Sequence, residues 1–198
     1  MTDQVSFEQT QTKPEAATVE VGSYLPSQEQ LQQIQALLDI LKQCDEQGIK
    51  ISVAGGYGLD GFYGSLTRDH HDADLLVRDA QEADLISLLE SNGYVRNKVT
   101  DQDVVGFSKP ESEHFKIEFA STAKLTQLTD LDSSHFLPDE PNATLLGQPF
   151  TVPDLPAQRE IIRIQEVRAK ANNWTPYPSE KIANRDAIFR EIGKMGLF

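Results

Sequence analysis

The chain has 198 residues, which is room for one compact domain and at most a small appendage. Its formal net charge is −13, from 31 acidic and 18 basic residues. This balance argues against a nucleic-acid partner, because such binding normally relies on Lys and Arg displacing counterions from phosphates. It is compatible with a cationic substrate, and equally with an acidic surface that only serves solubility.

The sequence gives no sign of membrane insertion or secretion. No apolar run approaches the roughly 18 residues that a membrane span needs. The first residues are not a basic leader followed by an apolar stretch, so a signal peptide is not expected. Cys44 is the single cysteine, which excludes an intrachain disulfide. We therefore expect a cytoplasmic protein without membrane contact.

The N-terminal part predicts a tail followed by a helix. Residues 1–23 are polar and lack apolar periodicity, which indicates a disordered or loosely attached segment. Apolar residues then recur at the spacing of one helical face from Leu31 to Cys44. Ser27 and Gln30 fit a capping box at the start of this helix, and Gly48 fits its end.

Short strands and helices are predicted to follow. We expect strands at 49–53 and 73–77, a short helix at 57–63, and a helix that begins with a capping box of Asp79 and Glu82 and ends at Gly93. Further strands are expected at 94–99, 104–108 and 115–120. In the last of these, apolar and charged residues alternate, which is typical of a half-buried strand.

The remaining chain predicts an irregular stretch and then helices. Residues 130–155 are rich in Pro and Asp, with a short hairpin expected over 145–152. Two helices are expected after it, one from Pro156 and one from Ser179. The result is an α+β fold, with a mixed sheet and flanking helices in residues 24–155 and a helical segment in residues 156–198.

The most informative stretch runs from Gly55 to Asp74. Gly55 and Gly56 stand between a predicted strand and a predicted helix, where glycine lets the backbone turn sharply and approach a ligand. The start of that helix offers free N–H groups and a positive dipole end, which suit a phosphate. A pair of glycines alone is weak evidence, because turns use glycine often.

Asp72 and Asp74 lie two residues apart at the start of a predicted strand, so their side chains point to the same face. Two like charges held together repel, and a cation relieves the conflict. Oxygen ligands suit Mg²⁺, which typically binds few carboxylates and completes its shell with water and substrate phosphates. The alternative for such a pair is capping or solvation at a strand end.

The whole segment resembles the signature of nucleotidyltransferases with the DNA-polymerase-β-like fold, in the branch that modifies aminoglycoside and lincosamide antibiotics. That signature is Gly-Gly-Trp-Ala-apolar-Asp, a Gly four residues on, then Thr-Arg-x-His-x-Asp-x-Asp. The chain keeps its order and spacing through Asp60, Gly64 and Thr67. It departs at Tyr57, where the branch usually has Trp, and at Gly58, where it has Ala.

The resemblance implies site residues and a reaction. Asp72 and Asp74 would bind Mg²⁺ together with a third carboxylate, for which Glu118 is the candidate and Glu111 and Glu113 the runners-up. Glu118 would hold a second Mg²⁺ or take the proton from the acceptor. The reaction would be in-line displacement at the α-phosphorus of ATP or another nucleoside triphosphate, which releases pyrophosphate.

Nucleotide contacts are implied in the same way. Gly55 and Gly56 would hold the triphosphate, with Tyr57, Thr67 and Arg68 as further nucleotide-binding candidates. Tyr57 could stack on a base or line the acceptor pocket. Arg68 could touch a phosphate, or pin the loop by pairing with Asp60 or Asp69.

Two other features of the stretch and its surroundings carry weaker signals. His70 and His71 invite a zinc hypothesis, but adjacent side chains point apart in an extended chain and no Cys is near. We therefore expect His70 to orient the loop and His71 to be exposed. The run from Arg185 to Ile188 weakly resembles a basic-Asp-x-Ile helix of this fold, without a role assigned.

The acceptor remains open at this point. The leading hypothesis, implied by the resemblance, is transfer of a nucleoside monophosphate, AMP from ATP, to a hydroxyl of a small molecule such as an aminoglycoside or lincosamide. A protein acceptor is a second hypothesis. A third is a nucleotide-binding module without catalysis, which would follow if Glu118 lay away from Asp72 and Asp74.

Overall fold

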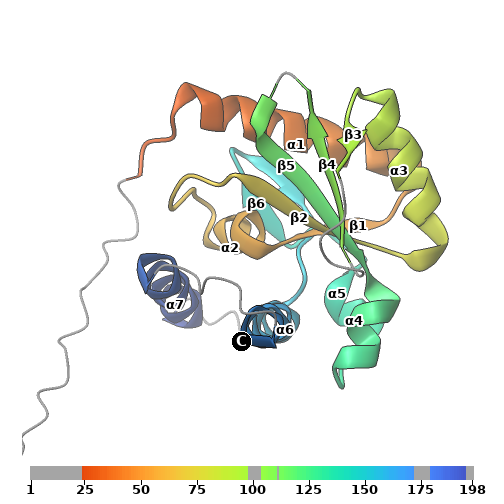
Figure 1. The fold of residues 1–198 in the computed structure, drawn as a ribbon. Helices are drawn as coiled ribbons and strands as arrows, with labels where there is room; N and C mark the ends of the chain where they lie inside the picture. Colours follow the sequence, from red (N-terminus) through yellow and green to blue (C-terminus); the bar gives the residue numbers. More distant parts are fainter. Residues whose placement is uncertain (1–23, 98–103, 111, 172–178, 195–198) are drawn as a thin grey trace, which may run out of the picture.

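The computed structural model describes residues 24–97, 104–110, 112–171 and 179–194. Its centre is a five-stranded mixed sheet in the order β1-β2-β5-β4-β3 (Figure 1). The strands are β1 (Ile51–Ala54), β2 (Asp72–Val77), β3 (Val95–Arg96), β4 (Val105–Lys109) and β5 (Ser112–Ser121). β2 and β5 pair in parallel, and the other neighbours are antiparallel. The predicted tail at 1–23 and the end of the predicted 94–99 strand lie outside the described residues.

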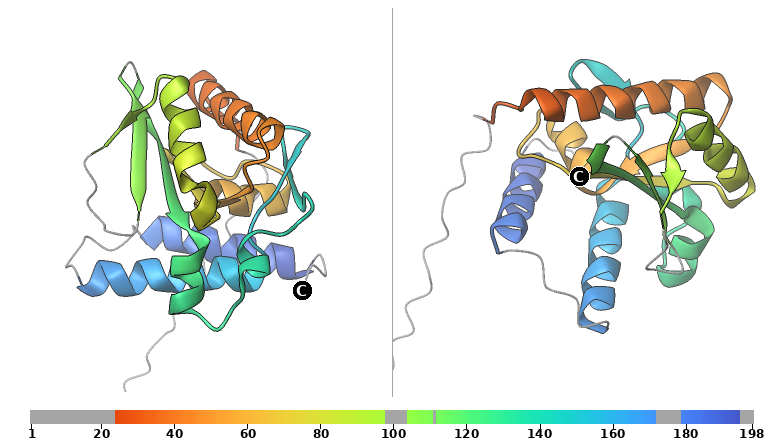
Figure 2. Two further views of the ribbon diagram at one scale, coloured as in Figure 1. Left: turned by 90° about the vertical axis from the view of Figure 1, so that its right-hand side faces the viewer. Right: turned by 45° about the horizontal axis from the view of Figure 1, so that its top comes forward.

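Two helices cover one face of the sheet. α1 (Gln28–Glu46) and α3 (Glu82–Ser91) lie side by side on it (Figure 2). The strand residues beneath them are apolar and buried: Ala73, Leu75, Val77, Phe115, Ile117 and Phe119. Each large apolar side chain buried in this way contributes roughly 1.5–3 kcal/mol, so this face anchors the fold. The alternation predicted for 115–120 is confirmed, as is the core position of Cys44.

The opposite face of the sheet carries the C-terminal helices. α4 (Thr122–Leu128), α5 (Ser133–Phe136) and α6 (Leu155–Ala171) form a second core there with Leu76 of β2. α7 (Ser179–Lys194) lies near α6, and its Ile188 and Ile192 pack against Leu59 of α2 (Gly55–Tyr63). Figures 1 and 2 show α6 and α7 together on the side away from α1 and α3. The α+β prediction, with its mixed sheet and flanking helices, is confirmed.

Local predictions were right in part. The predicted hairpin is present as β6 (Ala143–Leu145) and β7 (Gln148–Phe150). α4 and α5 were not predicted, although Ser121 and Asp132 cap them by accepting backbone N–H bonds. The capping box of Asp79 and Glu82 is wrong: a short 3₁₀ turn, η1 (Asp79–Gln81), leads into α3, and neither start has a side-chain cap.

The start of α1 differs from its prediction for a physical reason. Ser27 accepts a bond from the Gln30 N–H, as expected of a cap. The Gln30 side chain, however, does not return to the cap but is buried, where it contacts the hydroxyl of Tyr57 and accepts from the His70 N–H at 2.7 Å. Gln30 thus takes the buried position at the start of the helix, and Leu31 is 40% exposed.

None of the described helices combines the length and the apolar character that crossing a membrane requires.

A pair formed by His135 and Asp154 joins α5 to the start of α6. His135 Nδ1 lies 2.6 Å from Asp154 Oδ2, and the other carboxylate oxygen of Asp154 caps α6 at the Ala157 N–H. The hydrogen bond to Asp154 raises the pKa of His135 above its ordinary 6.5. The connection matters because α6 forms one wall of the cavity described below.

This pair predicts a pH-dependent contribution to stability. Because the pKa of His135 is higher in the folded state than in the unfolded state, its stabilising effect is complete below pH 6.5 and is lost as the pH rises through the folded pKa. His135→Asn should therefore lower the melting temperature more at pH 6 than at pH 8.5, measured by circular dichroism. An equal decrease at both pH values would contradict the assignment.

Candidate active site

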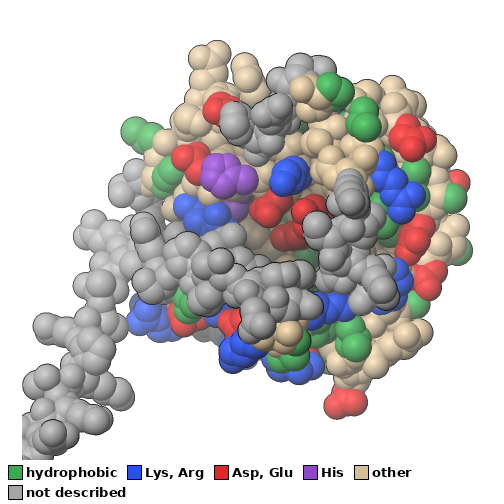
Figure 3. Space-filling view, viewed as in Figure 1, with side chains coloured by type: hydrophobic (Ala, Val, Ile, Leu, Met, Phe, Trp, Pro, Cys, Tyr) green, Lys and Arg blue, Asp and Glu red, His purple; other side chains and the backbone are tan. Residues whose placement is uncertain are grey.

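The largest concentration of candidate residues lines one open cavity, whose space is about 840 Å³ when the solvent at its mouth is included. It lies between the second face of the sheet, the start of α2, the loop at 64–71, and the helices α6 and α7. Figure 3 shows acidic and basic side chains gathered around a hollow on this side of the molecule. The cavity is therefore built from both the sheet and the C-terminal helical segment.

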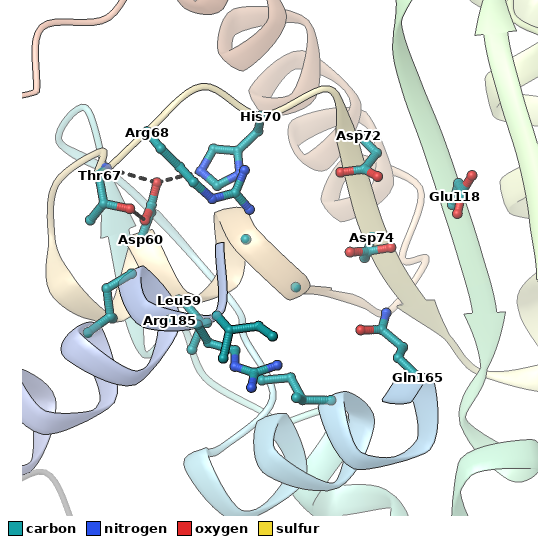
Figure 4. Close-up of a pocket in the computed structure, with 15 residues that line it drawn as sticks. Leu59, Asp60, Thr67, Arg68, His70, Asp72, Asp74, Glu118, Gln165 and Arg185 are labelled. Carbon is teal, nitrogen blue, oxygen red and sulfur yellow. Dashed lines mark hydrogen bonds and ion pairs between the residues drawn. The ribbon is translucent and has the colours of Figure 1, made fainter. Parts of the chain in front are cut away.

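Three carboxylates reach this cavity from neighbouring strands. Asp72 and Asp74 lie on the same face of β2, and Glu118 of β5 is the register partner of Asp74 in the parallel pair (Figure 4). Their apolar neighbours Ala73 and Ile117 point to the other face, into the core. The strand alternation thus separates the acidic face from the apolar one.

The three carboxylates do not form a closed metal cage. Among the described residues, no group of three His, Cys, Asp or Glu side chains is arranged to hold a metal ion together. A cation at this place would need oxygen ligands from another source as well. Mg²⁺ normally has such a mixed shell, because it keeps water and substrate phosphates alongside one or two carboxylates.

The glycines at the start of α2 are required by side-chain packing. Gly55 has a φ of +62°, and a Cβ at this position would overlap the Asp74 carboxylate. A Cβ at Gly56 would overlap the ring of His70 and crowd the Arg68 guanidinium. The space beside the two glycines is thus filled by protein side chains, although both residues still line the cavity.

A buried polar network fixes the loop that precedes β2. Asp60 of α2, which is fully buried, accepts from the Thr67 hydroxyl at 2.7 Å and lies 2.6 Å from His70 Nε2 (Figure 4). The prediction that His70 orients the loop is confirmed, and His71 is exposed as expected. The network holds the loop against α2, so it also positions Asp72 at the loop's end.

Arg68 and Tyr57 occupy different environments from each other. Arg68 lines the cavity, and its guanidinium donates to the backbone carbonyl of Asp69 at 2.7 Å. The carboxylate of Asp60, considered above as a partner of Arg68, is bonded to Thr67 and His70. Tyr57 is 1% exposed and packs on His70. It does not line the cavity, and burial raises the pKa of its hydroxyl. A stacking role for Tyr57 therefore has no support from its position.

The far wall of the cavity was missed by sequence reasoning. It is formed by Leu59, Ile162, Gln165, Ile182, Arg185 and Ile188. The isoleucines gave only an amphipathic pattern, which looks the same for a core face and a pocket face. Arg185 was noted without a role. Its side chain is 19% exposed and pairs with Glu166 of α6 at 2.9 Å.

Comparison of folds defines the class of protein. The crystal structure of ANT(2'')-Ia in complex with adenylyl-2''-tobramycin is similar at a TM-score of 0.64 and 17% identity, covering 84% of this chain and 92% of that one. The solution structure of the antibiotic-resistance factor ANT(2'')-Ia is also similar, at a TM-score of 0.64 and 16% identity over 85% and 88% of the two chains. An antigenic nucleotidyltransferase-like protein from Paracoccidioides brasiliensis is similar at a TM-score of 0.50 and 17% identity, covering 82% of this chain and 76% of that one. The fold is that of the nucleotidyltransferases.

The family is defined by sequence. Residues 36–146 match the aminoglycoside-2''-adenylyltransferase family, and the chain belongs to this family of nucleotide-transferring enzymes. The matched region contains the glycines, the loop, Asp72, Asp74 and Glu118, and it ends before α6 and α7. No curated protein is similar enough in sequence to count as a match.

The contact between Gly55 and Asp74 predicts a specific effect of a single methyl group. Gly55→Ala should displace the Asp74 carboxylate and reduce nucleotidyl transfer by at least about 100-fold, the loss typical of removing one electrostatic contact to a transition state. Gly64→Ala is the matched control, because Gly64 also has a positive φ (+79°) but no atom within 4 Å of an added Cβ.

The control isolates backbone strain from the clash. The left-handed conformation should cost each variant roughly 1–2 kcal/mol of stability, and the overlap with the Asp74 carboxylate should add to this cost in Gly55→Ala only; urea denaturation measures both losses. Only Gly55→Ala should also lose activity out of proportion to its folded fraction. Equal activity in the two variants would show that the Asp74 position does not depend on Gly55.

Proposed function

We propose that the protein transfers AMP from ATP to a hydroxyl group of an aminoglycoside-type acceptor, with Mg²⁺ as cofactor and pyrophosphate as the second product. The observation that carries the proposal is the position of Asp72, Asp74 and Glu118, which line one cavity together with the start of α2. Family membership supports the reaction class. Modification of an antibiotic would make the protein a resistance factor.

The residues fit a magnesium ion shared with the nucleotide. Asp72 and Asp74 present two carboxylates on one strand face, and the glycine at position 55 leaves the room that the Asp74 carboxylate needs. Asp72 and Asp74 would hold the ion, and phosphate oxygens and water would supply its other ligands. When bound, Mg²⁺ would neutralise charge on the phosphates and so favour displacement at the α-phosphorus.

The remaining groups would position the phosphates. Ala54 provides no side-chain cap at the start of α2, and Gly55 and Gly56, the first residues of this helix, line the cavity. The first N–H groups of a helix have no partner within the helix and suit a phosphate. The Arg68 guanidinium lies beside Gly56 on the same wall. A triphosphate placed here would receive both backbone donors and a fixed positive charge.

Glu118 is the group proposed to activate the acceptor. Its carboxylate would accept the hydroxyl proton as the acceptor oxygen forms a bond to the α-phosphorus. The bond from the α-phosphorus to the bridging oxygen breaks in the same displacement, and pyrophosphate leaves with that electron pair. Glu118 lies on β5, beside the two proposed metal ligands of β2, which is the arrangement that this division of roles requires.

Charge supports a cationic acceptor. Among the described residues of the cavity lining, four are acidic (Asp60, Asp72, Asp74 and Glu118) and two are arginines. The whole chain carries a formal net charge of −13. Aminoglycosides carry several ammonium groups, so an acidic cavity and an acidic protein attract them. The tobramycin moiety in the complex of ANT(2'')-Ia belongs to this class of molecule.

The proposal is tested by product formation. The protein is incubated with each nucleoside triphosphate, Mg²⁺ and either tobramycin or lincomycin, and pyrophosphate and the modified antibiotic are quantified by mass spectrometry. We expect AMP transfer to tobramycin with ATP, and its loss when EDTA removes Mg²⁺. Labelling of protein instead of antibiotic would contradict the proposed acceptor, and no transfer to any acceptor would contradict catalysis.

Asp74→Asn should reduce this transfer by at least about 100-fold, because the amide cannot supply the negative charge that binds the metal. The fold should persist, since Asn has nearly the same shape, and circular dichroism checks this. Asp79→Asn is the control, because Asp79 is exposed in η1 and does not line the cavity. Full turnover by Asp74→Asn would refute the metal assignment.

A further inference from the structure

The C-terminal wall of the cavity contains a cation that the family match does not reach. Arg185 lies on α7, outside the matched residues 36–146. Ile182 and Ile188 are three residues before and after it, so all three lie on one face of the helix, and all three line the cavity. Packing of Ile188 and Ile192 against Leu59 of α2 holds this face toward the site.

Arg185 is held in place with part of its hydrogen-bonding capacity unused. Its Nη2 atom lies 2.9 Å from a carboxylate oxygen of Glu166, and its Nε atom lies 3.6 Å from Asp186 Oδ1. A guanidinium has five N–H donors in a planar fork. Among the described residues, no hydrogen-bond partner is recorded for the Nη1 donors. An anion in the cavity can therefore bind without breaking the Glu166 pair.

The sign of the charge selects the ligand. A guanidinium repels the ammonium groups of a cationic acceptor and attracts phosphate oxygens, with which its fork forms paired hydrogen bonds. Figure 4 shows Arg185 across the cavity from Asp72 and Asp74, and Gly55 and Gly56 line the same cavity. A triphosphate between these walls would meet the carboxylate-bound metal on one side and a fixed cation on the other.

From this arrangement we propose that Arg185 binds the triphosphate of the nucleotide, and that Glu166 positions its guanidinium for that contact. The inference rests on the proposed function and adds a nucleotide contact from α7. It makes the C-terminal helical segment part of the nucleotide site. Residues from both ends of the cavity, Arg68 and Arg185, then balance the charge of the phosphates.

The test measures equilibrium binding of ATP with Mg²⁺ in the absence of acceptor, by titration calorimetry on the full chain. Arg185→Gln should raise the Kd for ATP by about 10- to 100-fold, the loss typical of hydrogen bonds to a charged group. Arg185→Lys keeps the charge but loses the planar fork of donors, so its Kd for ATP should lie between those of the native protein and Arg185→Gln. In turnover assays, the KM for ATP should rise more than kcat falls, and the Kd for tobramycin should not increase.

Two controls separate a direct contact from a structural effect. Arg159→Gln removes a guanidinium of α6 that lies over the Phe189 ring and does not line the cavity, so it should change the Kd for ATP by less than about twofold. The double variant Glu166→Gln with Arg185→Gln removes both partners of the pair. If the single variant were weak only because Glu166 was left unpaired, the double variant would recover ATP affinity.

The outcomes distinguish the two proposals. If the native protein binds ATP and Arg185→Gln binds it equally well, or if the double variant recovers, the role of Arg185 is overturned while the reaction stands. If Arg185→Gln weakens tobramycin binding instead, Arg185 belongs to the acceptor site and the inference is also wrong. If the native protein binds no nucleoside triphosphate, the proposed function itself fails.

Discussion

The close approach of the Asp74 carboxylate to the backbone of Gly55 is the contact on which the rest of the site depends. It requires a residue without Cβ at a positive φ, directly after β1 and at the start of α2. It places a carboxylate of β2 beside the first residues of a helix. Two features that would each be unremarkable alone, a glycine turn and an acidic strand end, become one site because they touch.

One face of the sheet stabilises the fold, and the other carries the candidate catalytic groups. The face beneath α1 and α3 is apolar, and its burial supplies much of the stability. The face toward α6 and α7 carries Asp72, Asp74 and Glu118, and α6 packs on Leu76 of the same strand. The acidic groups can therefore be held near one another without being buried in the main core, where isolated charges would be costly.

The loop between α2 and β2 is positioned by a network of buried and half-buried polar groups. Asp60 fixes Thr67 and His70, and Gln30 of α1 binds the His70 N–H and contacts Tyr57. This network joins the first helix of the domain to the strand that bears the candidate metal ligands. It explains why Tyr57, predicted as a nucleotide contact, is instead a core residue whose hydroxyl serves this network.

The sequence by itself determined the alternation of 115–120 and the position of Asp72 and Asp74 on one strand face, because these follow from side-chain periodicity along a single strand. The resemblance in the Gly55–Asp74 stretch added Glu118 as a candidate. Only the tertiary structure decided that Glu118 is the register partner of Asp74, that Tyr57 is buried, and that Arg185 and the isoleucines of α6 and α7 complete the cavity. Amphipathic periodicity says which face of a helix is covered, but the identity of what covers it depends on contacts between segments far apart in the chain.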